Sequence, residues 1–179
     1  MNQKIIYLNG FMAAGKSTIG PILANTLGWE FFDLDKVIEE ELGKKIVEIF
    51  SEKGEKYFRD KESEILGKLS KMKNVVISLG GGTSCSNNNL EIISKTGTIV
   101  YLKASPEALF NRLRNKKDRP LFNDANTKDE LKNKIVQLLK QRTPFYEQAD
   151  LIINTDIVPL GLTVDKIARL ISKKIDEEN

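Results

Sequence analysis

The residues best suited to chemistry lie near the N-terminus, in Gly10-Phe11-Met12-Ala13-Ala14-Gly15-Lys16-Ser17, which matches the pattern G-x-x-x-x-G-K-[ST]. Glycines let such a loop wrap an anion with backbone N–H groups, and a following helix adds the partial positive charge of its N-terminus. Lys16 would reach the β- and γ-phosphates of a nucleotide, and the Ser17 hydroxyl would ligate Mg²⁺. The motif predicts nucleotide phosphate binding, but it does not identify the reaction.

Two carboxylates follow the second predicted strand, Asp33 and Asp35. Side chains two residues apart on a strand point to one face, and ligands of open α/β sheets bind beyond the carboxyl ends of the strands. One carboxylate could support Mg²⁺, while the other accepts a proton from an attacking hydroxyl. The alternative is that Asp35 only caps a helix beginning at Lys36.

Further candidates are three successive glycines, Gly80, Gly81 and Gly82, and individual arginines. The glycines permit positive φ and close approach of the backbone to a ligand, although a tight turn at the end of a strand would explain them too. A guanidinium suits phosphate and carboxylate better than an ammonium does. Arg59 lies in a helical stretch, where an exposed position is the alternative, and Arg119 and Arg142 lie near prolines.

Short apolar runs alternate with helical patterns, which predicts a parallel sheet covered by helices. The predicted strands span 4–8, 30–34, 75–79, 98–102 and 151–153. The predicted helices span 16–27, three stretches from 35 to about 70 broken near Gly43 and Gly54, 90–94, 106–114, 128–148 with an interruption at Pro144, and 164–175. We therefore expect an α/β fold in which residues 1–179 form one three-layer α/β/α domain with a five-stranded parallel sheet.

Composition excludes several classes of function. The chain has 28 basic and 25 acidic residues, a balance that does not favour nucleic-acid binding. It has no histidine, which excludes Ser-His and His-metal sites, and its one cysteine, Cys85, cannot form an intrachain disulfide. No apolar run approaches the ~20 residues of a membrane span. We expect a cytoplasmic protein with no nucleic-acid or membrane partner.

Two other classes of nucleotide-binding protein fit less well. Asn115-Lys116-Lys117-Asp118 spells the guanine-reading motif N-K-x-D, but it lies in the polar segment 115–126 and not at the end of a buried strand, and the chain has no D-x-x-G. A motor ATPase would end a hydrophobic strand in Asp-Glu, whereas the strand at 75–79 ends in glycines. The class of nucleotide-binding protein that remains is a kinase that phosphorylates a small metabolite.

The order of motifs resembles the shikimate kinase family over essentially the whole chain. The motifs are G-x4-G-K-S-T, then D-x-D, Phe-Arg, G-G-G, R-P-L and R-x-P-x-Y. The resemblance implies a P-loop kinase fold of the nucleoside-monophosphate-kinase type, usually monomeric. It also implies transfer of the ATP γ-phosphoryl group to the 3-hydroxyl of shikimate with Mg²⁺, in aromatic amino acid biosynthesis. A helical region at about 35–70 would bind shikimate, and 115–126 would form a lid.

The same resemblance implies roles for individual residues. The catalytic residues would be Asp35 as the base, Lys16, and Arg119 on the lid. Shikimate would contact Asp35, Arg59, Gly80, Gly81, Gly82 and Arg142, with Phe50 and Phe58 as an apolar wall. ATP would contact Ala13, Ala14, Gly15, Lys16, Ser17, Thr18, Arg112, Arg119, Asn154 and Pro159. Ser17 and Asp33 would hold Mg²⁺.

Two alternatives stay open at this point. One is a related sugar-acid kinase, such as a gluconate kinase, which a substrate panel would separate from a shikimate kinase. The other is a nucleotide switch or binding module without turnover, which a preference for GTP in a binding assay would indicate. Ala13 also departs from the family pattern, because many relatives have glycine there, and a small side chain should be tolerated.

Overall fold

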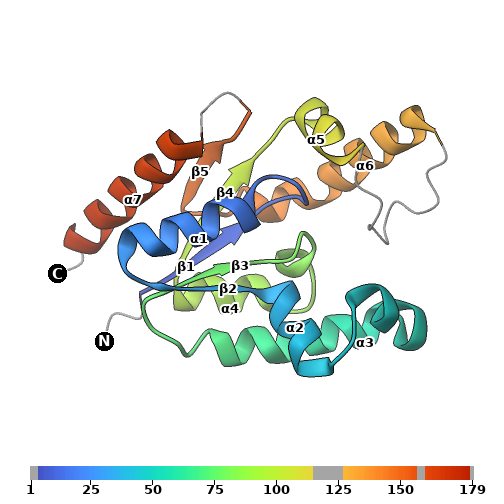
Figure 1. Ribbon diagram of the computed structural model, residues 1–179, viewed down its shortest axis with the longest axis horizontal. Coiled ribbons are helices and arrows are strands. Elements are labelled where there is room, and N and C mark those ends of the chain that lie inside the picture. Colours follow the sequence, from blue (N-terminus) through green and yellow to red (C-terminus); the bar gives the residue numbers. More distant parts are fainter. Residues whose placement is uncertain (1–3, 115–126, 157–159, 178–179) are drawn as a thin grey trace.

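A five-stranded sheet forms the centre of the computed structural model, which describes residues 4–114, 127–156 and 160–177 (Figure 1). The strands are β1 (Ile5–Asn9), β2 (Glu30–Asp33), β3 (Val75–Ser78), β4 (Thr98–Lys103) and β5 (Leu151–Asn154). Their order is β2-β3-β1-β4-β5, and every neighbouring pair is parallel. The predicted α/β fold with a five-stranded parallel sheet is confirmed.

The strands alternate with helices along the chain. The helices are α1 (Lys16–Leu27), α2 (Leu34–Leu42), α3 (Ile46–Leu69), α4 (Asn89–Thr96), α5 (Pro106–Leu113), α6 (Lys128–Tyr146) and α7 (Leu160–Glu177). A short 3-10 helix, η1 (Thr83–Cys85), follows the glycines after β3 and was not predicted. No helix in the described ranges is both long and apolar enough to cross a membrane.

Alternate residues of the strands enter two hydrophobic clusters, one on each face of the sheet. Ile6 and Leu8 of β1 join the cluster that contains residues of α1 and α7, whereas Ile5 and Tyr7 join the cluster that contains residues of α3 and α4. Side chains alternate across a strand, so both faces of a buried parallel strand must be apolar. Figure 1 shows α1 and α7 packed side by side on one face, which gives the predicted three layers.

Two glycines predicted to break the helical stretch after β2 do so, each at positive φ. Gly43 follows the last residue of α2 with φ 63°, and Gly54 kinks α3 with φ 81° and ψ 169°. The predicted interruption at Pro144 was wrong, because α6 continues through it to Tyr146. Pro144 lies in the last turn, where a missing N–H removes only one hydrogen bond and the helix is about to end.

The sheet brings three connections to one edge. Asp33 at the end of β2 and Leu8 near the end of β1 both lie beside Ser78 of β3. The segments that follow these strands are the phosphate loop, the start of α2 and the three glycines. Ligands of such sheets bind beyond the carboxyl ends of the strands, so this edge is where a functional site is expected.

Candidate functional site

The phosphate loop takes a backbone shape that glycine favours. Gly10, Ala13 and Gly15 all have positive φ, at 139°, 62° and 111°. A Cβ atom at Gly10 would lie 2.7 Å from the carbonyl oxygen of Leu102, so no larger residue fits there. Ala13 carries a Cβ in the left-handed region, which costs roughly 1–2 kcal/mol. Ala13 thus lies in a conformation that glycine adopts more easily.

Lys16 lies across the loop that it follows. Its Nζ donates to the carbonyl oxygens of Gly10 at 2.6 Å and Phe11 at 2.9 Å, and the side chain is nearly buried. Lys16 is the first residue of α1, at the helix end where backbone N–H groups lack helical partners. The loop therefore brings an ammonium group to the N-terminus of a helix, the combination that suits a phosphate site.

Ser17 and Asp33 are held together beside the loop. The Ser17 hydroxyl donates to Asp33 Oδ2 at 2.9 Å, and Asp33 Oδ1 accepts the backbone N–H of Asp35 at 3.2 Å. A hydroxyl and a carboxylate oxygen are ligands that suit Mg²⁺, which also takes phosphate oxygens and water. No group of three or more potential metal-binding side chains occurs within the described ranges, and a phosphate-bound Mg²⁺ does not need one.

The two aspartates meet at the site for a reason other than the predicted one. Asp33 ends β2, whereas Asp35 lies in the first turn of α2, so they do not share one face of a strand. The alternative, that Asp35 caps a helix beginning at Lys36, was also wrong. The helix begins at Leu34, and Asp33 is its N-cap. Capping by Asp33 leaves the Asp35 carboxylate available for another role.

Two cavities lie on either side of Asp35. The first, of about 740 Å³, is lined by the phosphate loop together with Asp33, Arg112 and Thr155. The second, of about 750 Å³, is lined by residues of α2, α3 and the three glycines, and by Arg142. Met12, Asp35 and Gly81 line both. A phosphate held in the first cavity and a molecule held in the second would therefore meet at Asp35.

The surroundings of Asp35 favour its protonated form more than water does. Burial and, to a smaller extent, the negative charges of Asp33 and Glu62 raise the pKa of this carboxyl to about 6, against the opposing effect of the cations of Lys16 and Arg59. A carboxyl with this pKa is mostly ionised at neutral pH, yet more basic than an ordinary aspartate. This is the property required of a general base.

The three glycines are needed for close approach and not for positive φ. None of them is among the positive-φ glycines, and Gly82 has φ −112°. A Cβ at Gly80 would lie 2.8 Å from Asp35 Oδ1, and one at Gly82 would lie 2.6 Å from Arg59 Nη2. At Gly81 a Cβ would lie 3.3 Å from Arg142 Nη1. Each glycine thus leaves room for a different side chain of the second cavity.

Two arginines lie beside these glycines. Arg59 donates from Nη1 to Glu62 Oε2 at 2.8 Å and from Nη2 to Glu55 Oε1 at 3.2 Å. Arg142 is nearly buried and donates from Nη1 to the carbonyl oxygen of Gly81 at 3.0 Å. Both line the second cavity, where guanidinium groups are suited to a carboxylate.

Aromatic rings cover another side of the second cavity. The rings of Phe50 and Phe58 have centroids 4.7 Å apart, and both line this cavity. The Arg59 guanidinium also lies 5.1 Å from the centre of the Phe58 ring. The predicted apolar wall and the predicted arginine therefore belong to one cluster on α3.

The far side of the first cavity is built from Arg112 and the residues after β5. Arg112 donates to the carbonyl oxygens of Thr155 at 2.8 Å and Ala13 at 3.2 Å, which ties that segment to the phosphate loop. Asn154 accepts the backbone N–H of Asp156 at 2.8 Å, and it is the adjacent Thr155 that lines the cavity. Arg119, Pro159 and the predicted lid at 115–126 lie outside the described residues.

Sequence reasoning missed two polar residues at the second cavity, Glu62, which lines it, and Thr83, which lies behind Glu62. Glu62 is wholly buried and Thr83 is buried beside it, with the Thr83 hydroxyl donating to Glu62 Oε1 at 2.6 Å. The only signal for Glu62 was its position three residues after Arg59 on a helix, a spacing that brings opposite charges together. Nothing in the sequence pointed to Thr83.

Comparisons with known proteins agree with this arrangement. The family described as shikimate kinase matches residues 12–174. A shikimate kinase of Chlorobaculum parvum is 45% identical over 178 residues, covering 97% of this chain and 95% of its own. The crystal structure of a shikimate kinase from Bacteroides thetaiotaomicron has a TM-score of 0.88 at 40% identity, covering 94% of this chain and 98% of its own.

A second solved structure is that of a shikimate kinase from Acinetobacter baumannii in complex with shikimate. Its TM-score is 0.89 at 37% identity, and the match covers 96% of this chain and 94% of that chain. The sequence match and both structural matches extend over nearly the whole chain, so they cover both cavities. The chain belongs to the shikimate kinase family.

Proposed function

We propose that this protein transfers the γ-phosphoryl group of ATP to the 3-hydroxyl of shikimate, giving shikimate 3-phosphate and ADP for aromatic amino acid biosynthesis. The observation that carries the proposal is that two cavities of similar size share Asp35. One contains the phosphate loop, and the other contains two guanidinium groups and an aromatic wall. An in-line transfer needs donor and acceptor to meet at one base.

ATP occupies the first cavity in this proposal. Lys16 and the N–H groups of the loop bind the phosphates and stabilise the charge that spreads over the γ-phosphoryl oxygens during transfer. Arg119 from the lid would add a second cation, and Arg112 would lie against the adenine. The full nucleotide set is Ala13, Ala14, Gly15, Lys16, Ser17, Thr18, Arg112, Arg119, Asn154 and Pro159. Support comes from the cavity lining, which includes Arg112 and the whole loop segment from Ala13 to Thr18.

One Mg²⁺ ion accompanies ATP, held by the Ser17 hydroxyl and the Asp33 carboxylate. The hydrogen bond between these two groups already places two suitable oxygen atoms side by side. When bound, the ion neutralises phosphate charge and orients the phosphates. Asp33 also fixes the first turn of α2 through the Asp35 N–H, so the same carboxylate positions both the metal site and the base.

Shikimate occupies the second cavity. Arg59 and Arg142 bind its carboxylate, the backbone of Gly80, Gly81 and Gly82 approaches its ring, and Phe50 and Phe58 pack against its apolar face. Asp35 accepts a hydrogen bond from the hydroxyl that attacks and takes its proton as the O–P bond forms. Support comes from the lining of this cavity, which includes all of these residues.

We further propose that residues 1–179 act as a single kinase domain, as a monomer in the cytoplasm. In this arrangement the helical region at about 35–70 binds shikimate and the lid at 115–126 closes on ATP. Closure would keep water away from the transferring phosphoryl group. The continuous match of residues 12–174 to one family supports the single domain.

A coupled assay of ADP release tests the reaction and the acceptor together. The protein is incubated with ATP and Mg²⁺ alone, with shikimate, and with gluconate. We expect strong stimulation by shikimate only. Stimulation by gluconate would transfer the assignment to a sugar-acid kinase. ATP binding without stimulation by either acid would favour a nucleotide-binding module and overturn the proposal.

Arg59→Ala should weaken shikimate binding and leave ATP binding unchanged. Loss of a charge-assisted bond to a carboxylate is expected to raise the KM for shikimate by about 10- to 100-fold. Steady-state kinetics with each substrate varied in turn measures the effect. Arg169→Ala is the control, because Arg169 is an exposed arginine of α7 that lines neither cavity. Equal losses of affinity for ATP and for shikimate would contradict the proposal that Arg59 binds the shikimate carboxylate.

The pH profile should report the state of Asp35. Because burial raises its pKa to about 6, the base is protonated and inactive below that pH. We expect kcat/KM for shikimate to be nearly flat at neutral pH and to fall about tenfold per unit of pH below about 6. A flat profile down to about pH 4, the ordinary range of an aspartate, would show that Asp35 is not the base.

A further inference from the structure

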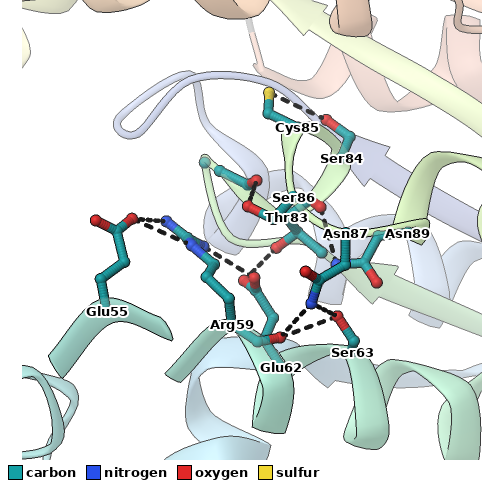
Figure 2. A network of polar contacts seen from close by, with 12 residues as sticks. Glu55, Arg59, Glu62, Ser63, Thr83, Ser84, Cys85, Ser86, Asn87 and Asn89 are labelled. Carbon is teal, nitrogen blue, oxygen red and sulfur yellow. Dashed lines mark hydrogen bonds and ion pairs between the residues drawn. The ribbon is translucent and has the colours of Figure 1, made fainter. Parts of the chain in front are cut away.

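A buried polar network joins α3 to η1 (Figure 2), and two of its members, Arg59 and Glu62, line the second cavity. At its centre, the Glu62 side chain is completely buried. Its Oε2 accepts from Arg59 Nη1 at 2.8 Å, and its Oε1 accepts from the Thr83 hydroxyl at 2.6 Å. A buried carboxylate is costly unless both oxygens are paired, so Arg59 and Thr83 together make this charge tolerable.

The turn that carries Thr83 is itself fixed. The Asn89 amide donates to the Thr83 carbonyl oxygen at 3.0 Å inside the core. Asn87, at φ 47°, donates from Nδ2 to the carbonyl oxygen of Arg59 at 3.2 Å and to Ser63 Oγ at 2.8 Å. The turn thus holds α3 at the backbone of Arg59 and, through Glu62, at its guanidinium.

Arg59 forms ion pairs with two carboxylates, those of Glu55 and Glu62, and the two differ in burial. Glu62 is wholly buried, whereas the Glu55 side chain is 61% exposed. An ion pair with an exposed carboxylate contributes little and is easily exchanged for water. The orientation of the guanidinium toward Gly82 and the second cavity therefore depends on Glu62, and the orientation of Glu62 depends on Thr83.

We propose that Thr83 is a positioning residue for shikimate binding, acting through Glu62 to hold the Arg59 guanidinium against Gly82 in the geometry that receives the substrate carboxylate. Thr83 is not among the residues that line the second cavity, so its effect is indirect. The inference rests on the proposed function, because it requires the acceptor's carboxylate to bind at Arg59. It gives η1 a role in substrate affinity.

These contacts require a side chain with a hydroxyl group at residue 83. Without the Thr83 hydroxyl, Glu62 Oε1 is buried without its hydrogen-bond donor. The Glu62 side chain then has to rotate, or move out of its buried position, to find another donor. Arg59 then loses its buried partner and turns toward Glu55 and solvent. Substrate and transition state both carry the carboxylate, so the loss should appear in KM and hardly in kcat.

Thr83→Val and Thr83→Ser test whether this hydroxyl is required. Valine keeps the shape and removes the hydroxyl, whereas serine keeps the hydroxyl. We expect Thr83→Val to raise the KM for shikimate about tenfold, with kcat and the KM for ATP within about twofold of wild type. Thr83→Ser should restore the wild-type KM. Glu55→Gln is the matched control, since it removes the exposed partner of the same guanidinium and should change the KM by less than about twofold.

The outcomes separate this inference from the proposed function. Wild-type protein without shikimate-dependent turnover refutes the function. Active wild-type protein with an unchanged shikimate KM in Thr83→Val overturns the inference, even if thermal unfolding shows lower stability. Equal KM increases in the valine and serine variants would also overturn it, because the hydroxyl would then be irrelevant.

Glu62→Gln provides a second test that does not depend on the valine variant folding. It should raise the KM for shikimate about as much as Thr83→Val does, with kcat and the KM for ATP within about twofold of wild type. Combining Glu62→Gln with Thr83→Val should add little to the KM increase of either change alone, because both act through the contact between Glu62 and Arg59. Fully additive KM increases would contradict the proposed geometry.

Discussion

Asp35→Asn is expected to slow phosphoryl transfer severely and at the same time to stabilise the folded protein at neutral pH. Asparagine keeps the size of the side chain but cannot take the proton of the attacking hydroxyl. General-base catalysis contributes roughly 10²- to 10⁴-fold, so kcat should fall by about that factor. Single-turnover measurement with ATP and shikimate at saturation gives the change directly.

The gain in stability follows from the sign of the pKa shift. Burial raises the pKa of Asp35 from an ordinary 3.8 to about 6, so the folded state holds the proton more tightly than the unfolded chain does. The associated stability is present below about pH 4 and is lost as pH rises through about 6. At neutral pH the ionised carboxylate then costs about 2 kcal/mol, after allowance for its partial contact with water. Asparagine removes this cost.

Thermal unfolding at two pH values checks the stability effect. A gain of about 2 kcal/mol corresponds to about 4–8 °C in Tm for a chain of this size. The difference between Asp35→Asn and wild type should be largest at neutral pH and should shrink toward zero near pH 4. A variant that is less stable than wild type at neutral pH would show that favourable contacts in the folded state offset the cost of burying the ionised carboxylate. A kcat within about tenfold of wild type would remove Asp35 from the role of base.

Lys16→Met should produce the second large loss. Methionine approximates the length of lysine and removes the ammonium group that would bind the β- and γ-phosphates. Loss of one preorganised donor to the transition state costs about 10²- to 10³-fold in kcat. Lys16 also lowers the pKa of Asp35, so the residual activity should have its acid limb at a higher pH than wild type. Stopped assays over a range of pH measure both effects.

Lys71→Met is the control for that experiment, because Lys71 is an exposed lysine in the turn after α3. The same change of charge there should leave kcat and the pH profile unaltered. An acid limb that does not move in Lys16→Met would mean that the ammonium group lies farther from the base than the structure places it.

The sequence was sufficient to predict the sheet and the phosphate loop. Both depend on local patterns, since the runs at β1, β3 and β4 are apolar enough to be buried on both faces and the loop is defined by fixed residues. The aspartates were correctly placed near the site but for the wrong reason. The start of α2 at Leu34 depends on the side chain of Asp33 acting as its cap, which is a contact and not a pattern.

The network around Arg59 could not be predicted from the sequence. Glu62 lies in a helix rich in charged residues, where most glutamates are exposed, and only the packing of η1 against α3 reveals that this one is buried. Thr83 lies 21 residues away from it along the chain. Contacts between such distant segments depend on tertiary structure, and one sequence without related sequences does not record them.

The three glycines have a consequence for inhibition. A compound that hydrogen-bonds the backbone at Gly80, Gly81 and Gly82 would contact a surface that mutation cannot easily alter, because a methyl group at these positions would press against Asp35, Arg142 or Arg59. Each substitution that weakened binding of the compound would therefore also lower the activity of the enzyme. Resistance to that class of compound would have to arise elsewhere in the pocket wall, for example at Val47, which lines the second cavity and is exposed.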